Sequence, residues 1–410
     1  MRARAVITGL GLVTPVGHGV EGYWNAITGG RSGIGRITLF DTTGCTVQIG
    51  GEVKNLDFAD HIPSDSSRKM SRASKLAVVA ARMAHENSGL EITEGNRDLI
   101  DVFLGVACMD FDTVARNILR RRQRGDRACS PLAPAISLAS APAGNVSIAL
   151  GVHGEVMTFS TACSSSLNAL GHALRKIRSG SARVIFAGGA EAGIQADLIA
   201  SFANAGTLSL RNDDPEHASR PFEAHRDGHV MGEAAVIMVL EEYEHARARD
   251  ARIYAEIVGY GTSNDSRTMG AVSEDERDAT RCVRRTLQDA ERDADDVDFY
   301  CAHGTAAPVT DARETRMLKR ALGEHAYRVP VSGIKSMTGH PLGAAGALQA
   351  ATCALAIQRH AVPPTINYED PDPACDLDYV PNEARAHDVD LALSYSLGMG
   401  NNAALTLAAC

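Results

Sequence analysis

One cysteine in the sequence stands in a setting that favours nucleophilic chemistry. Cys163 lies in the segment TACSSS, residues 161–166, between a β-rich run and an amphipathic helical pattern. Ser164 or Ser165 can cap the predicted helix, and the free N–H groups at a helix N-terminus favour a thiolate and lower a cysteine pKa. A strand, a sharp turn and a helix are also how hydrolases present a nucleophile. The pattern predicts a nucleophilic thiol, and the alternative is a buried structural cysteine.

Two histidines and a lysine follow later predicted strands. His303 lies in CAHGT, and Lys335 and His340 lie in GIKSMTGH. Residues at the carboxyl ends of strands point into the crevice where α/β proteins place their sites. Lys335 could pair with Glu314, which follows His303 on the next predicted helix. GIKSMTGH lacks the spacing of a phosphate-binding P-loop, so the alternative for these residues is an ordinary polar loop.

A glycine-rich segment, LGMGNN at residues 397–402, follows the predicted strand at 391–395. Such a loop can direct backbone N–H groups at a developing oxyanion. The alternative is a simple turn between two strands.

The elements that must position these residues alternate between short β-rich runs and helical patterns. The predicted strands cover residues 5–8, 102–106, 156–159, 184–187, 235–240, 253–258, 297–301, 328–331, 391–395 and 403–407. The predicted helices cover residues 21–27, 74–85, 165–177, 197–204, 278–289, 311–322 and 343–358. This order predicts βαβ units and sheets covered on both faces. A break near Tyr254 divides the elements into two comparable sets, and the proline-rich residues 362–383 are expected to form a long loop.

The composition is that of a soluble globular protein, with 410 residues of which 44% are hydrophobic and 22% charged. A net charge of −9 argues against a protein that binds nucleic acid or an anionic membrane through bulk charge. Nine cysteines without a C-x-x-C pair indicate reduced thiols in a cytoplasmic protein. The apolar run at residues 234–240 is far shorter than the ~18 residues that suggest a membrane span.

Taken together and in order, these segments resemble the β-ketoacyl-acyl-carrier-protein synthases, the elongating ketosynthases. Cys163, His303, Lys335 and His340, each in its motif, carry most of the resemblance. It covers nearly the whole chain and includes VITGLG at 6–11, AGGAE at 187–191, RPF at 220–222, RDG at 226–228 and LEEYEHA at 240–246.

The resemblance implies a thiolase-like α/β fold, with two similar halves in a five-layered αβαβα structure and usually an obligate dimer. We expect an N-terminal half at residues 1–252 that carries Cys163. The C-terminal half, residues 253–410, is expected to carry the two histidines and the lysine.

The resemblance also implies a Cys-His-His mechanism. Cys163 would take an acyl chain from a carrier-protein thioester, and His303 and His340 would stabilise the enolate formed as a malonyl thioester loses CO2. No metal or redox cofactor is expected, since the substrates arrive on the phosphopantetheine arm of an acyl-carrier protein. The supporting residues would be Lys335 and Glu314, and the oxyanion hole would be the backbone N–H groups of Cys163 and Met399.

Three positions depart from the family pattern. The closing loop usually reads GFGGTN, whereas here it is GMGNN, one residue shorter, so Met399 replaces the gating phenylalanine. Of two threonines that usually bind the pantetheine amide, Thr305 remains and Ala307 takes the second position. Cys108 stands at the floor of the acyl pocket, where a branched aliphatic residue is usual. These departures favour a specialised polyketide or polyene ketosynthase.

Three alternatives stay open. The first is the elongating synthase of primary fatty-acid synthesis. A degradative thiolase would be expected to have a second cysteine near Met399, and none occurs there before Cys410. A chain-length-factor-like partner subunit, which has no catalytic role, typically lacks the nucleophile that Cys163 provides here.

A basic cluster stands out in this acidic chain. It includes Arg120, Arg121, Arg122 and Arg124, flanked by Arg116 and Arg127. The cluster is either a solvated helix face or a contact for an acidic carrier protein or partner subunit. The expected partners are therefore an acyl-carrier protein and a second subunit, identical or chain-length-factor-like.

Overall fold

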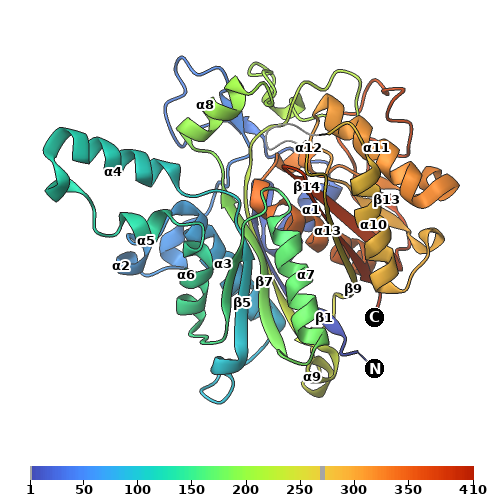
Figure 1. Cartoon of the computed structure of the whole chain (residues 1–410), viewed down its shortest axis with the longest axis horizontal. Helices are drawn as coiled ribbons and strands as arrows, with labels where there is room; N and C mark the ends of the chain where they lie inside the picture. The colour runs from blue at the N-terminus through green and yellow to red at the C-terminus, as the bar shows by residue number, and fades with distance from the viewer. Residues whose placement is uncertain (1, 268–272) are drawn as a thin grey trace.

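The computed structural model of the chain describes residues 2–267 and 273–410, and its centre is one large mixed sheet (Figure 1). Ten strands follow one another across it in the order β11-β10-β14-β15-β9-β1-β8-β7-β5-β6, with β2 paired to β1. The first half contributes β1 (Ala5–Thr14), β2 (Gly17–His18), β5 (Ile100–Gly105), β6 (Val156–Phe159), β7 (Val184–Ala192) and β8 (Glu233–Glu242). The second half contributes β9 (Ala255–Asn264), β10 (Phe299–Cys301), β11 (Val331–Ser332), β14 (Leu391–Gly398) and β15 (Asn401–Ala408).

The two halves of the sheet repeat one topology. In the first half, β1 pairs antiparallel with β8 and β8 antiparallel with β7, after which β7, β5 and β6 run parallel. In the second half, β9, β15, β14, β10 and β11 follow in the same senses. The expectation of a duplicated α/β architecture is confirmed, and the exact boundary at 252/253 stays a prediction. Because β1 also pairs with β9, the two halves join edge to edge.

Helices lie in three layers around this sheet. Between the halves lie α7 (Ser165–Arg178) and α13 (Ala345–Arg359), each contacting strands of both halves. On the outer faces, α3 (Arg72–Ser88) and α6 (Ala141–Leu150) cover the first half, while α10 (Arg277–Ala290) and α11 (Pro308–Leu322) flank the second. The arrangement is the thiolase-like αβαβα fold. Its middle layer is aliphatic and alanine-rich, and α13 is buried along nearly its whole length.

The remaining elements are shorter or peripheral. They are α1 (Gly19–Thr28), α2 (Ser64–Ser67), α4 (Phe111–Arg124), α5 (Ala133–Ser137), α8 (Ala196–Asn204), α9 (Tyr243–Ala248), α12 (Lys335–Thr338) and the small strands β3 (Gly35–Arg36), β4 (Ile49–Gly50), β12 (Ala361–Val362) and β13 (Arg385–Ala386). Helix α4 projects from the body, at the left of Figure 1. The two chain ends lie close together, where Arg4 contacts Cys410.

The structure corrects some of the predicted elements. The first strand is longer than the predicted residues 5–8: β1 runs on through Gly9 and Gly11, and the lack of a side chain at these glycines lets α3 approach closely. A Cβ on Gly11 would lie 1.8 Å from the Ala80 carbonyl oxygen. The predicted strand at 328–331 is also wrong, since only its last residue joins β11.

The loop expected at residues 362–383 is confirmed. Between β12 and β13 this proline-rich segment forms no helix and no extended strand. Its only regular backbone pairing there is a few isolated β-bridges. All nine cysteines, each within the described residues, are free thiols. In residues 2–267 and 273–410, no helix combines the length and apolar character needed to span a bilayer.

Candidate active site

Cys163 sits in a tight turn between β6 and α7. The backbone of Ala162 takes the left-handed conformation, with φ of 52°, immediately before the cysteine. Strand β5 lies against the start of α7, where a Cβ on Gly105 would be 2.2 Å from the Ser166 nitrogen. The predicted elbow is therefore present. Ser164 is the N-cap residue but does not cap through its side chain, because its hydroxyl donates to the Thr161 carbonyl at 2.7 Å.

The thiol of Cys163 does not have the lowered pKa that a helix N-terminus suggested. Burial raises the pKa of Cys163 to about 12, and the nearby charge of Lys335 acts against this rise. The expectation of a lowered thiol pKa is therefore not met, because burial disfavours the charged form of the sulfur. The cysteine therefore rests as a thiol and needs a proton acceptor.

His340 provides such an acceptor. Its Nε2 lies 3.1 Å from Cys163 Sγ. The backbone of His340 is held on both sides, because its N–H donates to the Val230 carbonyl at 2.7 Å and its carbonyl accepts from Gly232 at 3.0 Å. Burial lowers the pKa of His340 well below its ordinary value, with Lys335 adding to the effect, so the imidazole is neutral near pH 7.

His303 lies on the turn after β10, beside His340. The two ring centroids are 5.4 Å apart and the rings are nearly perpendicular. Two buried carboxylates of α11 hold this turn. Glu314 accepts from the N–H groups of His303 at 2.7 Å and Gly304 at 2.8 Å. Asp311 accepts from the next two N–H groups.

Lys335 reaches the same turn from α12. Its ammonium donates to the backbone carbonyl of His303 and, at 3.4 Å, to Gln349 Oε1. The suggested Lys335–Glu314 pair does not form a direct contact, because Glu314 is taken up by the N–H groups of the turn and by the Tyr300 hydroxyl at 2.6 Å. Glu314 therefore influences Lys335 only through space.

The glycine-rich segment is a two-residue hairpin turn between β14 and β15. Met399 and Gly400 form it, with φ of 46° and 85°. The turn lies against the nucleophile, since a Cβ on Gly398 would be 2.6 Å from the Cys163 nitrogen. The Met399 side chain is 57% exposed. The turn interpretation is thus correct, and an oxyanion role for the Met399 N–H remains a prediction.

Cys108 borders a cavity of about 350 Å³ whose wall does not include Cys163, His303 or His340. It packs in the same cluster of side chains as Cys163 and Phe202. The cavity wall also includes Glu191, which accepts the N–H groups of Ala107 and Cys108, and whose pKa burial raises to about 7. The structure therefore brings Cys108 close to the site.

The two remaining predicted groups occupy different places. Thr305 is buried on the His303 turn, where its N–H donates to Asp311 at 3.0 Å. The arginine cluster lies outside the site, on α4, which has no buried residue. Its members Arg120, Arg121, Arg122 and Arg124 are all exposed.

Sequence reasoning missed two site residues. His229 directly follows the RDG motif, and its ring packs between those of Phe202, at 5.8 Å, and His340, at 5.5 Å. Gln349 lies on α13 and is fully buried against Lys335. The position of His229 next to a recognised motif was an available signal, whereas Gln349 lies in an alanine-rich helix that gives none.

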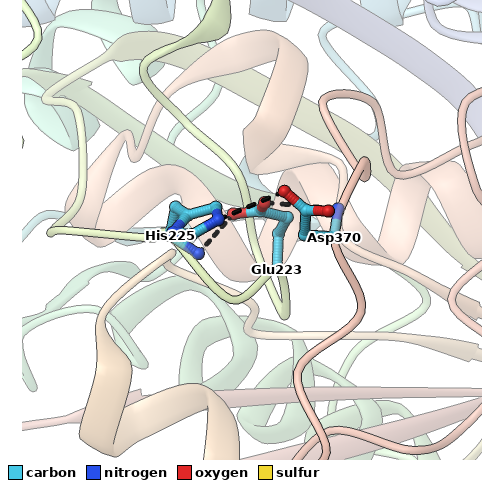
Figure 2. A group of neighbouring side chains, drawn as sticks. All are labelled: Glu223, His225 and Asp370. Carbon is cyan, nitrogen blue, oxygen red and sulfur yellow. Dashed lines mark hydrogen bonds and ion pairs between the residues drawn. The ribbon is translucent and has the colours of Figure 1, made fainter.

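Three ligand-type side chains cluster away from this site. The ligand atoms of Glu223, His225 and Asp370 lie within 4.8 Å of one another (Figure 2). The buried Glu223 already accepts backbone N–H groups of His225 at 2.6 Å and Asp370 at 3.4 Å. Through these hydrogen bonds Glu223 links its own segment, which includes His225, to the segment that contains Asp370.

Comparison with known proteins gives the family. Residues 2–246 match the β-ketoacyl synthase N-terminal domain, and residues 254–369 match the β-ketoacyl synthase C-terminal domain. The chain belongs to the β-ketoacyl synthase family. As a β-ketoacyl synthase it is an acyltransferase that condenses units carried on acyl-carrier protein.

Relatives and solved structures agree with this assignment. A 3-oxoacyl-[acyl-carrier-protein] synthase 2 of Synechocystis is 43% identical over 98% of this chain and 96% of its own. The ishigamide ketosynthase/chain length factor structure is 35% identical with a TM-score of 0.92 over 100% of both chains. A type II polyketide ketosynthase in complex with its acyl-carrier protein is 34% identical, with a TM-score of 0.92 over 100% of both chains.

Proposed function

We propose that this β-ketoacyl synthase condenses malonyl-carrier protein with an acyl chain held on Cys163, and that His303 and His340 are its other catalytic residues. The observation that carries the proposal is the convergence of one thiol and two imidazoles. His340 Nε2 lies 3.1 Å from the sulfur and the two imidazole rings are 5.4 Å apart.

The first step is acylation of Cys163. Because burial favours the thiol, neutral His340 accepts its proton as the sulfur attacks the carrier thioester. A carbon–sulfur bond forms to Cys163 and the bond to pantetheine breaks, and the proton passes to the departing pantetheine sulfur. The backbone N–H groups of Cys163 and Met399 stabilise the oxyanion, consistent with the contact between their two turns.

The second step is decarboxylation and carbon–carbon bond formation. Once Cys163 is acylated it no longer donates a proton, so His340 can carry its proton on Nε2 and donate with His303 to the enolate oxygen. The lowered pKa values of both histidines keep them neutral hydrogen-bond donors. The enolate carbon then attacks the acyl thioester and releases the Cys163 thiolate, which the charge of Lys335 favours and which takes up a proton.

Replacing the nucleophile separates these steps. Cys163→Ala should abolish condensation while malonyl-carrier protein still loses CO2, because the histidines act on the malonyl unit. Mass spectrometry should find an acyl adduct on the wild-type chain after incubation with acyl-carrier protein and none on the variant. Absence of the adduct on wild type would favour a chain-length-factor-like subunit, and condensation by the variant would refute the role of Cys163.

We further propose a specialised polyketide or polyene pathway, with primary fatty-acid elongation as the alternative. Cys108 beside the cavity leaves more room than a branched aliphatic would, and unbranched Met399 is a more adaptable gate than a phenylalanine. The wild-type enzyme should therefore acylate Cys163 with long or unsaturated chains, and Cys108→Phe should exclude these while it spares acetyl. A preference for acetyl alone in the wild type would refute the pocket assignment.

Thr305 is the proposed pantetheine contact. Its backbone is fixed by Asp311 next to His303, which leaves the hydroxyl to bind the amide of the arm. Thr305→Val should raise the KM of a free pantetheine thioester by about tenfold, the value of one hydrogen bond. An unchanged KM would remove Thr305 from this role.

The proposed partner subunit binds along β6. This strand ends the sheet, and it exposes Val156 and Met157, 40% and 42% of whose surface is accessible. An exposed apolar edge strand is a site for pairing with another chain, either a second copy or a chain-length-factor-like subunit. Met157→Lys should convert a dimer to monomers in light scattering, with the exposed Met399→Lys as the control for added charge. A dimer that persists in Met157→Lys would place the interface elsewhere.

We place the enzyme in the cytoplasm, where its free thiols stay reduced.

The exposed arginines of α4 are the proposed dock for the acidic carrier protein. Changing Arg120, Arg121 and Arg124 to Glu should raise the KM for carrier-bound substrate but not for a free pantetheine thioester, because only the carrier offers an extended acidic surface. The effect should weaken as salt rises. An equal response of both substrates would show that this cluster does not bind the carrier.

A further inference from the structure

Gln349 connects three parts of the active site through its amide group. From the second turn of α13 its side chain, which is fully buried, reaches the carboxyl end of β10 and Tyr395 within β14. Its Nε2 donates to the carbonyls of Cys301 at 3.1 Å, Ala302 at 2.8 Å and Tyr395 at 2.8 Å. The first two carbonyls immediately precede His303, and the third belongs to the strand that leads into the Met399 turn.

The other end of the same amide faces donors. Its Oε1 accepts from Ser396 Oγ at 2.9 Å and from Lys335 Nζ at 3.4 Å. Carbonyl oxygens surround Nε2 of Gln349, and hydrogen-bond donors surround its Oε1. These contacts therefore fit only one of the two orientations of the amide group. An ionised carboxylate at this position could still accept from Ser396 and Lys335 but could not donate to the three carbonyls.

Gln349 is also a neutral partner for a buried cation. The two partners of Lys335 Nζ are the His303 carbonyl and Gln349 Oε1, and both are uncharged. No carboxylate oxygen of residues 2–267 or 273–410 lies within the 4.0 Å ion-pair distance of Lys335. The buried carboxylates Glu314 and Asp311 therefore act on the ammonium only through space, unlike a carboxylate in direct contact with a lysine.

We propose that Gln349 is a positioning residue: it joins the strand ends that carry His303 and the Met399 turn, and its neutral side chain leaves the charge of Lys335 available to stabilise the thiolate of Cys163. This inference rests on the proposed role of Cys163 as nucleophile. Lys335 is the largest influence that acts against the raised pKa of Cys163. The other titratable groups around the thiol and the ammonium are Cys108, Glu191, His229, Cys301, His303, Asp311, Glu314 and His340.

Two substitutions at Gln349 separate the effect of a negative charge from the effect of losing the three hydrogen bonds. Gln349→Glu and Gln349→Met both lose the bonds to the three carbonyls, but only the glutamate places a negative charge on Lys335. We expect Gln349→Glu to raise the apparent pKa of Cys163 by about one pH unit relative to Gln349→Met, which means about tenfold slower alkylation by iodoacetamide near pH 8. Alkylation needs neither carrier protein nor condensation, so a failed ketosynthase role and a failed Gln349 role give different results.

Two controls sharpen the experiment. Gln358→Glu adds the same charge on the same helix, about 13 Å farther along its axis, and should leave the alkylation profile unchanged. In a Lys335→Met background, Gln349→Glu should have little further effect, because the charge that it neutralises is gone. This second comparison remains decisive if Gln349→Met does not fold.

Equal alkylation profiles for Gln349→Glu and Gln349→Met would overturn the proposal, as would a shift that persists without Lys335. If alkylation behaves as expected while condensation fails in the wild type, the proposed function is wrong and the electrostatic role of Gln349 stands.

Discussion

Glu314→Gln tests how far the position of His303 depends on one buried carboxylate. Glu314 accepts three short bonds: from the Tyr300 hydroxyl at 2.6 Å, the His303 N–H at 2.7 Å and the Gly304 N–H at 2.8 Å. The first two converge on one oxygen, and the third binds the other. If the amide oxygen of a glutamine keeps the first two donors, its NH2 group faces the Gly304 N–H without an acceptor.

The magnitude follows from that mismatch. A buried bond to a charged acceptor contributes about 1.5–3 kcal/mol, and leaving a buried N–H unsatisfied costs a similar amount. We expect the variant to lose about 2–3 kcal/mol of stability and the His303 turn to move away from α11. Displacement of a catalytic group by about 1 Å can cost on the order of a hundredfold in rate, so decarboxylation should fall about 10- to 100-fold.

The assay compares the two half-reactions in the same variant. Release of CO2 from malonyl-carrier protein reports the histidines, and acylation of Cys163 reports the nucleophile with His340. Because the hydrogen-bond partners of Glu314 are Tyr300 and the His303 turn, and not the turn of Cys163, acylation should change less than about threefold, and the exposed Glu324→Gln should change neither. An equal fall in both half-reactions, or unchanged CO2 release with the expected loss of stability, would refute the reasoning.

Three further outcomes follow from the site. Burial lowers the pKa of His229 to about 4 from its ordinary 6.5. Between these two pH values the unfolded chain binds a proton at His229 that the native chain does not bind. The free energy of unfolding therefore falls as the pH drops from 6.5 to about 4. His229→Phe should remove about 2 kcal/mol of that loss between about pH 7 and pH 4.5, measured by urea unfolding; an unchanged pH dependence would show that His229 is not buried neutral. His303→Ala should slow CO2 release by about 10²–10³-fold, and near-normal release would exclude it as a donor. Gly105→Ala, whose Cβ would meet the Ser166 nitrogen at 2.2 Å, should lower the melting temperature by several degrees and slow acylation, whereas a neutral effect would mean that α7 can move away.

The parts of the site that the sequence predicted are local. Cys163 and His303 each follow a predicted strand within four residues, and His340 lies in the motif GIKSMTGH at residues 333–340, so strand order and motifs were enough to select these three residues. The thiol pKa was mispredicted because the cost of burial depends on what packs around the sulfur, which no local pattern encodes. Gln349 was missed for the same reason, since its contacts join residues far apart in the chain, whereas His229 was missed although it directly follows the RDG motif.

In the fold, too, local features were predicted and features that depend on distant contacts were not. Most predicted strands and helices overlap observed ones, because two-residue and 3.6-residue periodicities are local signals. Helix α4 was not among the predicted elements, although Phe111, Val114 and Ile118 recur at helical spacing, and none of its residues is buried. The strand β1 was predicted too short, because its glycines are explained only by the approach of α3.

The pairing of β1 with β9 has a consequence for how the enzyme acquires activity during synthesis. The first strand of the chain pairs both with β8 of its own half and with β9 of the other. Domains tend to form as the chain emerges, N-terminal first, so the half with Cys163 can assemble while the edge of β1 still awaits its partner. His340, the proposed proton acceptor of the thiol, follows 177 residues later in the chain. A chain interrupted between the halves therefore holds a protonated, unassisted thiol, and chemical competence appears only when the second half docks on β1.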